Sequence, residues 1–235
     1  MTRGTGEASH SEASRPRTRR SGRTPRSRRI RAYIGLGSNV GEPEGTLAAA
    51  VATLAALPGA GLRAVSPLYA TAPVGVTDQP EFRNAVVALD VPAGPEPATG
   101  ALALLVALKA IERSFGRRER ERWGPRELDL DLLLFGRWSG SAVRPADARS
   151  DDPAKRDLPL TVPHPEARRR LFVLAPLADL APRLVPPGWG ETVARAAARQ
   201  RAIEGEDAVR RLGDWTGTGW TIAAGPIAAP DARPA

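Results

Sequence analysis

Residues 122–131 read RWGPRELDLD and lead directly into the apolar run LLLF at 132–135. The pattern predicts a cationic turn followed by a strand whose first half carries two carboxylates. Because successive side chains of a strand point to opposite faces, Asp129 and Asp131 share one face and the flanking leucines share the other. Unpaired buried charge is costly, so the two carboxylates need a partner. A hard divalent cation such as Mg²⁺, which binds one or two protein carboxylates, is the natural candidate.

Basic residues precede this carboxylate pair: Arg120, Arg122 and Arg126. Carboxylates for a metal and guanidinium groups for phosphate are the composition that phosphoryl transfer requires, since that chemistry depends on positioning and charge neutralisation. The pattern therefore favours a metal–phosphate site. An edge strand whose aspartates face solvent is the alternative that the pattern leaves open.

The charge of the chain is unevenly distributed over its 235 residues, with a net charge of +8. Residues 1–31 contain 10 Arg and two Glu, so the remainder is neutral as a whole. We expect residues 1–30, which have almost no hydrophobic side chain, to form a disordered Arg-rich tail. No aromatic residue is interleaved with these arginines for base stacking, so we expect nucleic-acid binding to be weak at most and confined to the tail.

Composition excludes several kinds of site. The chain has no Cys, which excludes disulfides and thiolate chemistry, and only two His, His10 and His164, which excludes a His-based zinc cluster. No apolar run is long enough to span a bilayer, and the basic N-terminus lacks the apolar segment of a secretory signal. We therefore expect a cytoplasmic protein without membrane association.

Hydrophobic periodicity along the chain predicts alternating strands and helices. Strands are expected near 31–37, 62–71, 82–91 and the opening stretch, helices near 43–57, 98–115 and 191–203, and a short apolar element at 171–180. The order βαββαβ is that of the ferredoxin-like α+β fold, a mostly antiparallel sheet with both helices on one face. The other face is then left to loops and to the C-terminal helices.

The folded domain is expected to span residues 31–204. Within it, residues 138–157 are polar and contain proline, which is typical of a flexible insertion. Beyond Gly205 the apolar density falls, and residues 205–235 are expected to form a loose C-terminal tail.

Several segments invite a binding interpretation. Residues 35–41 (GLGSNVG) match neither the Walker nor the dinucleotide-binding glycine spacing, so a structural strand-to-helix turn is expected there. Residues 72–80 contain two Pro and a Gly between strands, as a shaped binding loop would. Phe82 and Asn84 share a strand face and suit a flat heterocycle, since they combine a stacking surface with an amide. His164 is closely followed by three consecutive arginines. These residues could form a second cationic cluster that binds nucleotide phosphates, or they could simply be a solvated surface.

One family shares four stretches of this chain in the same order: AYIGLGSN at 32–39, PVGVTDQPEFRNAVV at 73–87, RWGPRELDLDLLLFG at 122–136 and LTVPHPEARRRLFVLAPL at 160–177. The chain resembles the 6-hydroxymethyl-7,8-dihydropterin pyrophosphokinases of the folate pathway from about residue 32 to about residue 199. The resemblance implies transfer of the β,γ-pyrophosphoryl group of ATP to the hydroxymethyl oxygen of the dihydropterin, giving AMP and the pterin diphosphate.

The resemblance also implies roles for individual residues. Asp129 and Asp131 match two aspartates that hold a pair of Mg²⁺ ions between the phosphates and the attacking hydroxyl. Pterin binding is implied for Thr71, the backbone near Val74, Phe82, Asn84, Trp123 and Phe172, with the ring between the two phenylalanines. ATP binding is implied for Glu112, Arg122, His164 and Arg170. Catalytic roles are implied for Arg117 and Arg126 beside Asp131.

Two departures from the family pattern bear on these roles. Phe82 stands where the family commonly has Tyr, which loses a hydroxyl and keeps the stacking face. The segment 117–121 is about one residue shorter than in well-known members, so its catalytic basic position stays open. Arg117 is the preferred candidate, with Arg118 and Arg120 as alternatives.

We expect a monomer that binds MgATP before the pterin and then closes loops 72–80 and 116–126 over both substrates. Two competing hypotheses remain. A nucleotidyl transferase could use the same aspartates for attack at the α-phosphorus. A nucleic-acid-binding module could instead rely on the Arg-rich tail.

Overall fold

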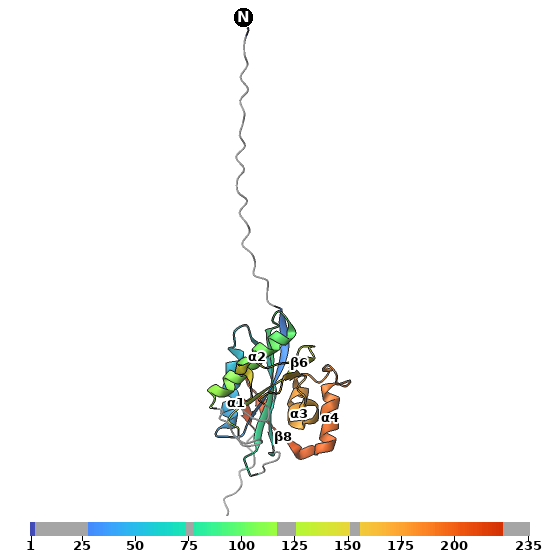
Figure 1. The fold of residues 1–235 in the computed structure, drawn as a ribbon. Coiled ribbons are helices and arrows are strands. Elements are labelled where there is room, and N and C mark those ends of the chain that lie inside the picture. The colour runs from blue at the N-terminus through green and yellow to red at the C-terminus, as the bar shows by residue number, and fades with distance from the viewer. Residues whose placement is uncertain (3–27, 74–77, 117–125, 151–155, 223–235) are drawn as a thin grey trace, which may run out of the picture.

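An antiparallel sheet of seven strands lies at the centre of the computed structural model, which describes residues 1–2, 28–73, 78–116, 126–150 and 156–222 (Figure 1). Its strands are β1 (Arg29–Ser38), β2 (Gly61–Val65), β3 (Leu68–Thr71), β4 (Phe82–Pro92), β5 (Asp129–Phe135), β8 (Val209–Trp215) and β9 (Trp220–Ile222). They lie in the order β5-β1-β4-β3-β8-β9, and β2 also pairs with β4.

The first part of the chain has the predicted βαββαβ order when β2 and β3 are counted as the single strand that was predicted at 62–71. β4 lies between β1 and β2 and is antiparallel to both, while β5 pairs antiparallel with the other edge of β1. This is the split βαβ arrangement of the ferredoxin-like fold. The predicted α+β class is therefore confirmed.

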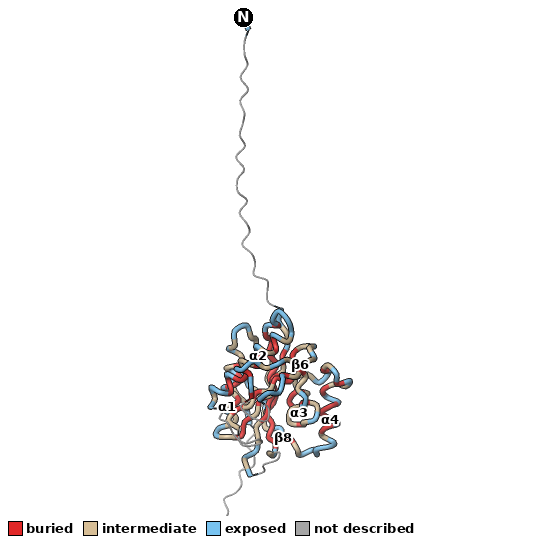
Figure 2. The backbone as a smooth tube through the Cα atoms, in the orientation of Figure 1, coloured by how far each residue is buried: buried red, intermediate tan, exposed pale blue. Residues whose placement is uncertain are grey.

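Four helices cover the two faces of the sheet. α1 (Pro43–Ala55) and α2 (Pro97–Ser114) lie on one side, as predicted, and α3 (Leu171–Leu180) and α4 (Val193–Glu204) lie on the other (Figure 1). Figure 2 shows the buried residues concentrated between these layers. The α1/α2 side is filled by Ile34, Leu36, Leu47, Leu54, Leu89, Leu105, Leu108, Leu130 and Phe135. The α3/α4 side is filled by Val86, Leu133, Leu134, Leu174, Leu177, Val193 and Ala196. No helix in the described ranges is long and apolar enough to cross a membrane.

The predicted single strand at 62–71 is two strands. β2 ends at Val65 and β3 begins at Leu68, because Pro67 has no N–H to donate to a ladder. Ser66 bridges the break: its N–H donates to the carbonyl of Val86 at 2.9 Å, and its Oγ accepts the N–H of Val86 at 2.9 Å. The long strand β4 therefore continues across both short strands.

The prediction of a loose tail from residue 205 is wrong for the part that the structure describes. β8 pairs with β3, and β9 folds back onto β8. The indole of Trp220 stacks edge-on against Trp215 at 4.7 Å between ring centroids, and its Nε1 donates to the carbonyl of Ser66 at 2.8 Å. An edge hairpin needs few apolar side chains, which is why low apolar density concealed it. Residues 223–235 lie outside the described residues.

The predicted flexible insertion at 138–157 is also partly ordered. β6 (Gly140–Ala142) pairs with β7 (Leu160–Val162), and a 3₁₀ turn, η1 (Ala146–Ala148), follows β6. Residues 151–155 lie outside the described residues, as do 3–27 of the predicted N-terminal tail. β1 already begins at Arg29, two residues before the expected start of the domain.

Asp90 on β4 gives a first testable prediction. Its buried carboxylate accepts from the Nε atoms of Arg31 and Arg63, each at 2.5 Å. The hydrogen bond from Arg31 is the main reason that the pKa of Asp90 lies below its ordinary value. Asp90→Asn should lower the free energy of unfolding by about 1 kcal/mol at pH 7, the upper end for partly exposed ion pairs.

The difference should depend on pH in a defined direction. A depressed carboxyl pKa stabilises the fold above the unfolded pKa of about 4, and this stabilisation is lost as pH falls through the folded pKa. Urea unfolding from pH 7 down to pH 3 should thus show wild type and Asp90→Asn converging, with the exposed Asp207→Asn as control. A gap of constant size over this range would contradict the assignment.

Candidate active site

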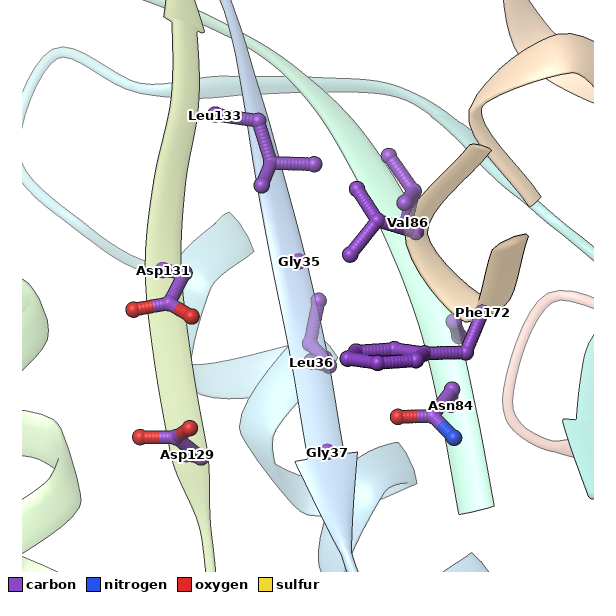
Figure 3. A pocket seen from close by; sticks show the side chains of 11 residues that line it. Gly35, Leu36, Gly37, Asn84, Val86, Asp129, Asp131, Leu133 and Phe172 are labelled. Atoms are coloured by element: carbon purple, nitrogen blue, oxygen red, sulfur yellow. The ribbon is translucent and has the colours of Figure 1, made fainter. Parts of the chain in front are cut away.

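The two aspartates of β5 lie on the face of the sheet that carries α3. Asp129, Asp131 and Leu133 alternate with Leu130 and Leu132, which point into the core under α1 and α2. The predicted shared face is therefore confirmed (Figure 3). Both aspartates are partly accessible.

Two glycines of β1 form the floor beside the aspartates. Gly35 pairs with Asp131 and Gly37 with Asp129 on one side of β1, while Val86 and Asn84 are their partners on β4. A Cβ atom at Gly37 would lie 3.3 Å from the Oδ1 of Asn84, so a side chain there would crowd the amide. These residues belong to a strand that continues to Ser38, so the expected turn at 35–41 begins later. Two glycines two residues apart were the available signal for close approach of a ligand.

Polar and aromatic side chains face the aspartates across these glycines. Asn84 and Thr71 are both buried, and the Nδ2 of Asn84 donates to the Oγ1 of Thr71 at 2.8 Å. Phe172, at the start of α3, lies with its ring over β1 (Figure 3). Asp129, Asp131, Asn84 and Phe172 thus line one pocket with the two glycines.

Asn39, which sequence reasoning did not single out, connects three segments around the site. Its backbone N–H donates to the carbonyl of Arg126 at 3.0 Å, and its Oδ1 accepts the N–H of Arg126 at 2.7 Å. Its Nδ2 donates to the Oε1 of Gln79 at 3.0 Å and to the carbonyl of Pro80 at 3.1 Å. The end of β1, the segment before β4 and the approach to β5 are therefore held together by one buried amide.

The carboxylates suit a hard divalent cation. The Oδ2 of Asp129 accepts from the Nη1 of Arg126 at 2.8 Å, so a guanidinium lies beside the pair. Within the described ranges no three His, Cys, Asp or Glu side chains gather at one point. Mg²⁺ commonly takes only one or two protein carboxylates and completes its octahedron with water and phosphate, so two aspartates on an accessible face fit it.

Comparisons with known proteins identify the family of this chain. Residues 33–182 match the model of the 7,8-dihydro-6-hydroxymethylpterin-pyrophosphokinase family. The chain belongs to this family. It is 47% identical over 158 residues to the 2-amino-4-hydroxy-6-hydroxymethyldihydropteridine pyrophosphokinase of Pseudomonas aeruginosa. The matched residues cover 67% of this chain and 84% of the Pseudomonas protein. The enzyme of the same name from Methylorubrum extorquens is 43% identical over 169 residues, covering 72% of this chain and 92% of that one.

A solved structure of Plasmodium falciparum HPPK-DHPS with pterin and p-hydroxybenzoate is similar in fold, with a TM-score of 0.61. It is 15% identical and covers 81% of this chain and 48% of that chain. At this identity the likeness concerns the fold alone.

In this pyrophosphokinase, Glu112 lies beneath the strand that carries the aspartates. Its carboxylate is fully buried, and its Oε1 accepts the N–H of Leu130 at 2.7 Å. Both of its oxygens also accept from the Nζ of Lys109 at 2.8 Å. Glu112, expected on the nucleotide side, thus holds β5 from the opposite face of the sheet, a position that the sequence did not predict.

The remaining predicted site residues are distributed around the pocket. Phe82, the first residue of β4, pairs with Thr71 but is not among the residues that line the pocket. The backbone N–H of His164 donates to the carbonyl of Leu133 at 2.9 Å, which places the histidine beside β5. The guanidinium of Arg170 lies 5.7 Å from the centroid of the Phe172 ring. Val74, Arg117, Arg122 and Trp123 lie outside the described residues.

Proposed function

We infer that the chain transfers the pyrophosphoryl group of ATP to 6-hydroxymethyl-7,8-dihydropterin in folate biosynthesis, giving AMP and the pterin diphosphate. Membership of the pyrophosphokinase family supports this activity. The observation that carries it is the pair of aspartates facing Asn84 across two side-chain-free positions of β1. Phosphates on the β5 side and a pterin on the β4 side would then meet over the glycines.

We propose that Asp129 and Asp131 hold two Mg²⁺ ions together with the phosphates. When bound, such ions neutralise the phosphates and lower the proton affinity of the hydroxymethyl oxygen. The residues of the chain position the reactants: the Oδ2 of Asp129 is paired with Arg126, and the buried Glu112 fixes Leu130 between the aspartates. No side chain needs to act as general base in this scheme.

The burial of Asn84 and Thr71 and the aromatic ring of Phe172 support the proposed pterin-binding roles of these residues. A buried amide bonded to a buried hydroxyl offers both donors and acceptors to the polar edge of a heterocycle. The Phe172 ring supplies an apolar face above the glycine floor. Phe82 and the backbone near Val74 complete the proposed pterin site, and Trp123 closes it.

Phe172→Ala should raise the KM for the pterin by about 10- to 100-fold, because a buried aromatic face is worth roughly 1.5–3 kcal/mol. The KM for ATP should change by less than threefold. Steady-state kinetics with each substrate varied in turn measure both values, and Phe172→Tyr, which keeps the ring, serves as the matched control. Equal changes in both KM values would contradict a pterin-specific role.

On the nucleotide side we propose His164, Arg170 and Arg122, with Glu112 acting through β5. Arg117 and Arg126 are the proposed catalytic cations. Loops 72–80 and 116–126 are proposed to close over both substrates and exclude water as acceptor. A cytoplasmic monomer remains the proposed state of the protein.

Product analysis tests this function against its alternatives. With ATP, Mg²⁺ and the hydroxymethyl pterin, pyrophosphoryl transfer releases AMP, whereas a nucleotidyl transferase would release pyrophosphate. Nucleic-acid binding is tested separately by deleting residues 3–27, a boundary that spares Arg29 and its contact with Gly59. The deletion should leave AMP formation intact and remove any weak binding to nucleic acid.

A further inference from the structure

The segment between β5 and β7 is fastened beside the active-site strand. β6 pairs with β7, and the N–H of His164, just after β7, donates to Leu133 of β5. Both terminal nitrogens of Arg113 on α2 donate to the carbonyl of Asp147, at 3.3 and 3.2 Å. Ala148 is fully buried, and η1 packs against α2. Residues 140–150 are thus held at both ends of their path.

This path brings Arg144 within electrostatic range of Asp131 and Glu112. Burial lowers the pKa of Arg144, and attraction to Asp131 and Glu112 partly offsets that effect. The Nε of Arg144 is buried and has no hydrogen-bond partner among the residues that the structure describes. A desolvated cationic donor without a partner is costly and calls for an explanation in a native protein. The residue as a whole is only partly buried, and an anionic ligand beside Asp131 would offer its guanidinium an acceptor.

We propose that Arg144 is a binding residue for the phosphate chain of ATP, contributed by the segment 140–150. The strand order decides between the two substrates. β5 is the edge strand, and the segment 140–150 is tied to it from outside the sheet through β7 and His164, whereas Asn84 lies on β4, on the far side of β1. Arg144 can therefore reach a phosphate beside Asp131, but it cannot reach the polar edge of a pterin bound at Asn84 and Thr71. A planar guanidinium with several donors also matches phosphate geometry.

The inference rests on the proposed function, and binding measurements with the full chain separate the two. The probe is α,β-methylene-ATP with Mg²⁺, which cannot be cleaved at the bond that the reaction breaks. Arg144→Met should weaken its affinity by about 10- to 100-fold, the range for a lost charged hydrogen bond. Arg144→Lys should recover part of the loss. Arg149→Met, an exposed arginine of the same segment, should bind like wild type.

The KM for the pterin should stay within twofold in Arg144→Met, which a general loss of structure would not allow. If Arg144→Met binds the analogue as tightly as wild type or more tightly, the arginine only neutralises Asp131 and Glu112, and the inference is overturned. A lower melting temperature with unchanged affinity would overturn it in the same way. Failure of the wild type to bind the analogue would instead remove the proposed function itself.

Discussion

Asp131→Asn should reduce kcat for AMP formation by about 100- to 1,000-fold, the scale seen when a group that stabilises transition-state charge is removed. The substitution keeps the shape of the side chain and removes the charge that would hold a cation. Asp131 lies on a strand paired with β1 and fixed from below through Leu130, so the loss should be chemical and not structural. Steady-state assays at saturating Mg²⁺ and ATP measure it.

A control variant and a stability measurement make this result specific to the site. Asp207→Asn, on the exposed turn η4 (Glu206–Ala208), should keep wild-type turnover. The melting temperature of Asp131→Asn should stay close to that of wild type. Turnover within tenfold of wild type would show that the β5 aspartates are not the metal site.

Glu112→Ala should lower the free energy of unfolding by about 3–5 kcal/mol, the usual cost of removing one partner of a buried ion pair. Lys109 would keep a charge whose side chain is 7% exposed, and the N–H of Leu130 would lose its acceptor. Chemical denaturation at pH 7 measures the loss. Activity should fall as well, because Leu130 lies between the two aspartates.

A double variant isolates the ion pair. Lys109→Met combined with Glu112→Leu removes both charges and keeps apolar volume, so it should regain much of the stability that Glu112→Ala loses. It should not regain full activity, since the acceptor for Leu130 is still missing. A loss below about 1 kcal/mol in Glu112→Ala would show that the buried pair does not hold β5.

Local sequence pattern predicted the fold and, within the pocket, Asp129, Asp131 and Asn84. Strand alternation alone places Asp129 and Asp131 on one face and predicts the shared face of Phe82 and Asn84. Periodicity also predicted the six elements of the ferredoxin-like core. Proline at position 67 split a strand, and its missing N–H was visible in the sequence although the interruption was not predicted.

The features that escaped prediction depend on contacts between distant parts of the chain. Glycines 35 and 37 become a binding floor only when β4 and β5 flank them. Asn39 meets Arg126 across 87 positions. Arg144 gains its place only because its segment folds back along β5 through β7. Local periodicity does not encode contacts between distant residues. The segment 138–157, which contains Arg144, was therefore predicted to be a flexible insertion.

The fate of the phosphorus atoms of ATP tests the central claim most directly. In a single turnover with Mg²⁺ and hydroxymethyl-dihydropterin, label at the β-phosphorus should appear in the pterin product, and label at the α-phosphorus should appear in AMP. The same experiment with Asp131→Asn should leave both labels in ATP. Label from the α-phosphorus in the pterin product would instead demonstrate nucleotidyl transfer and contradict the account.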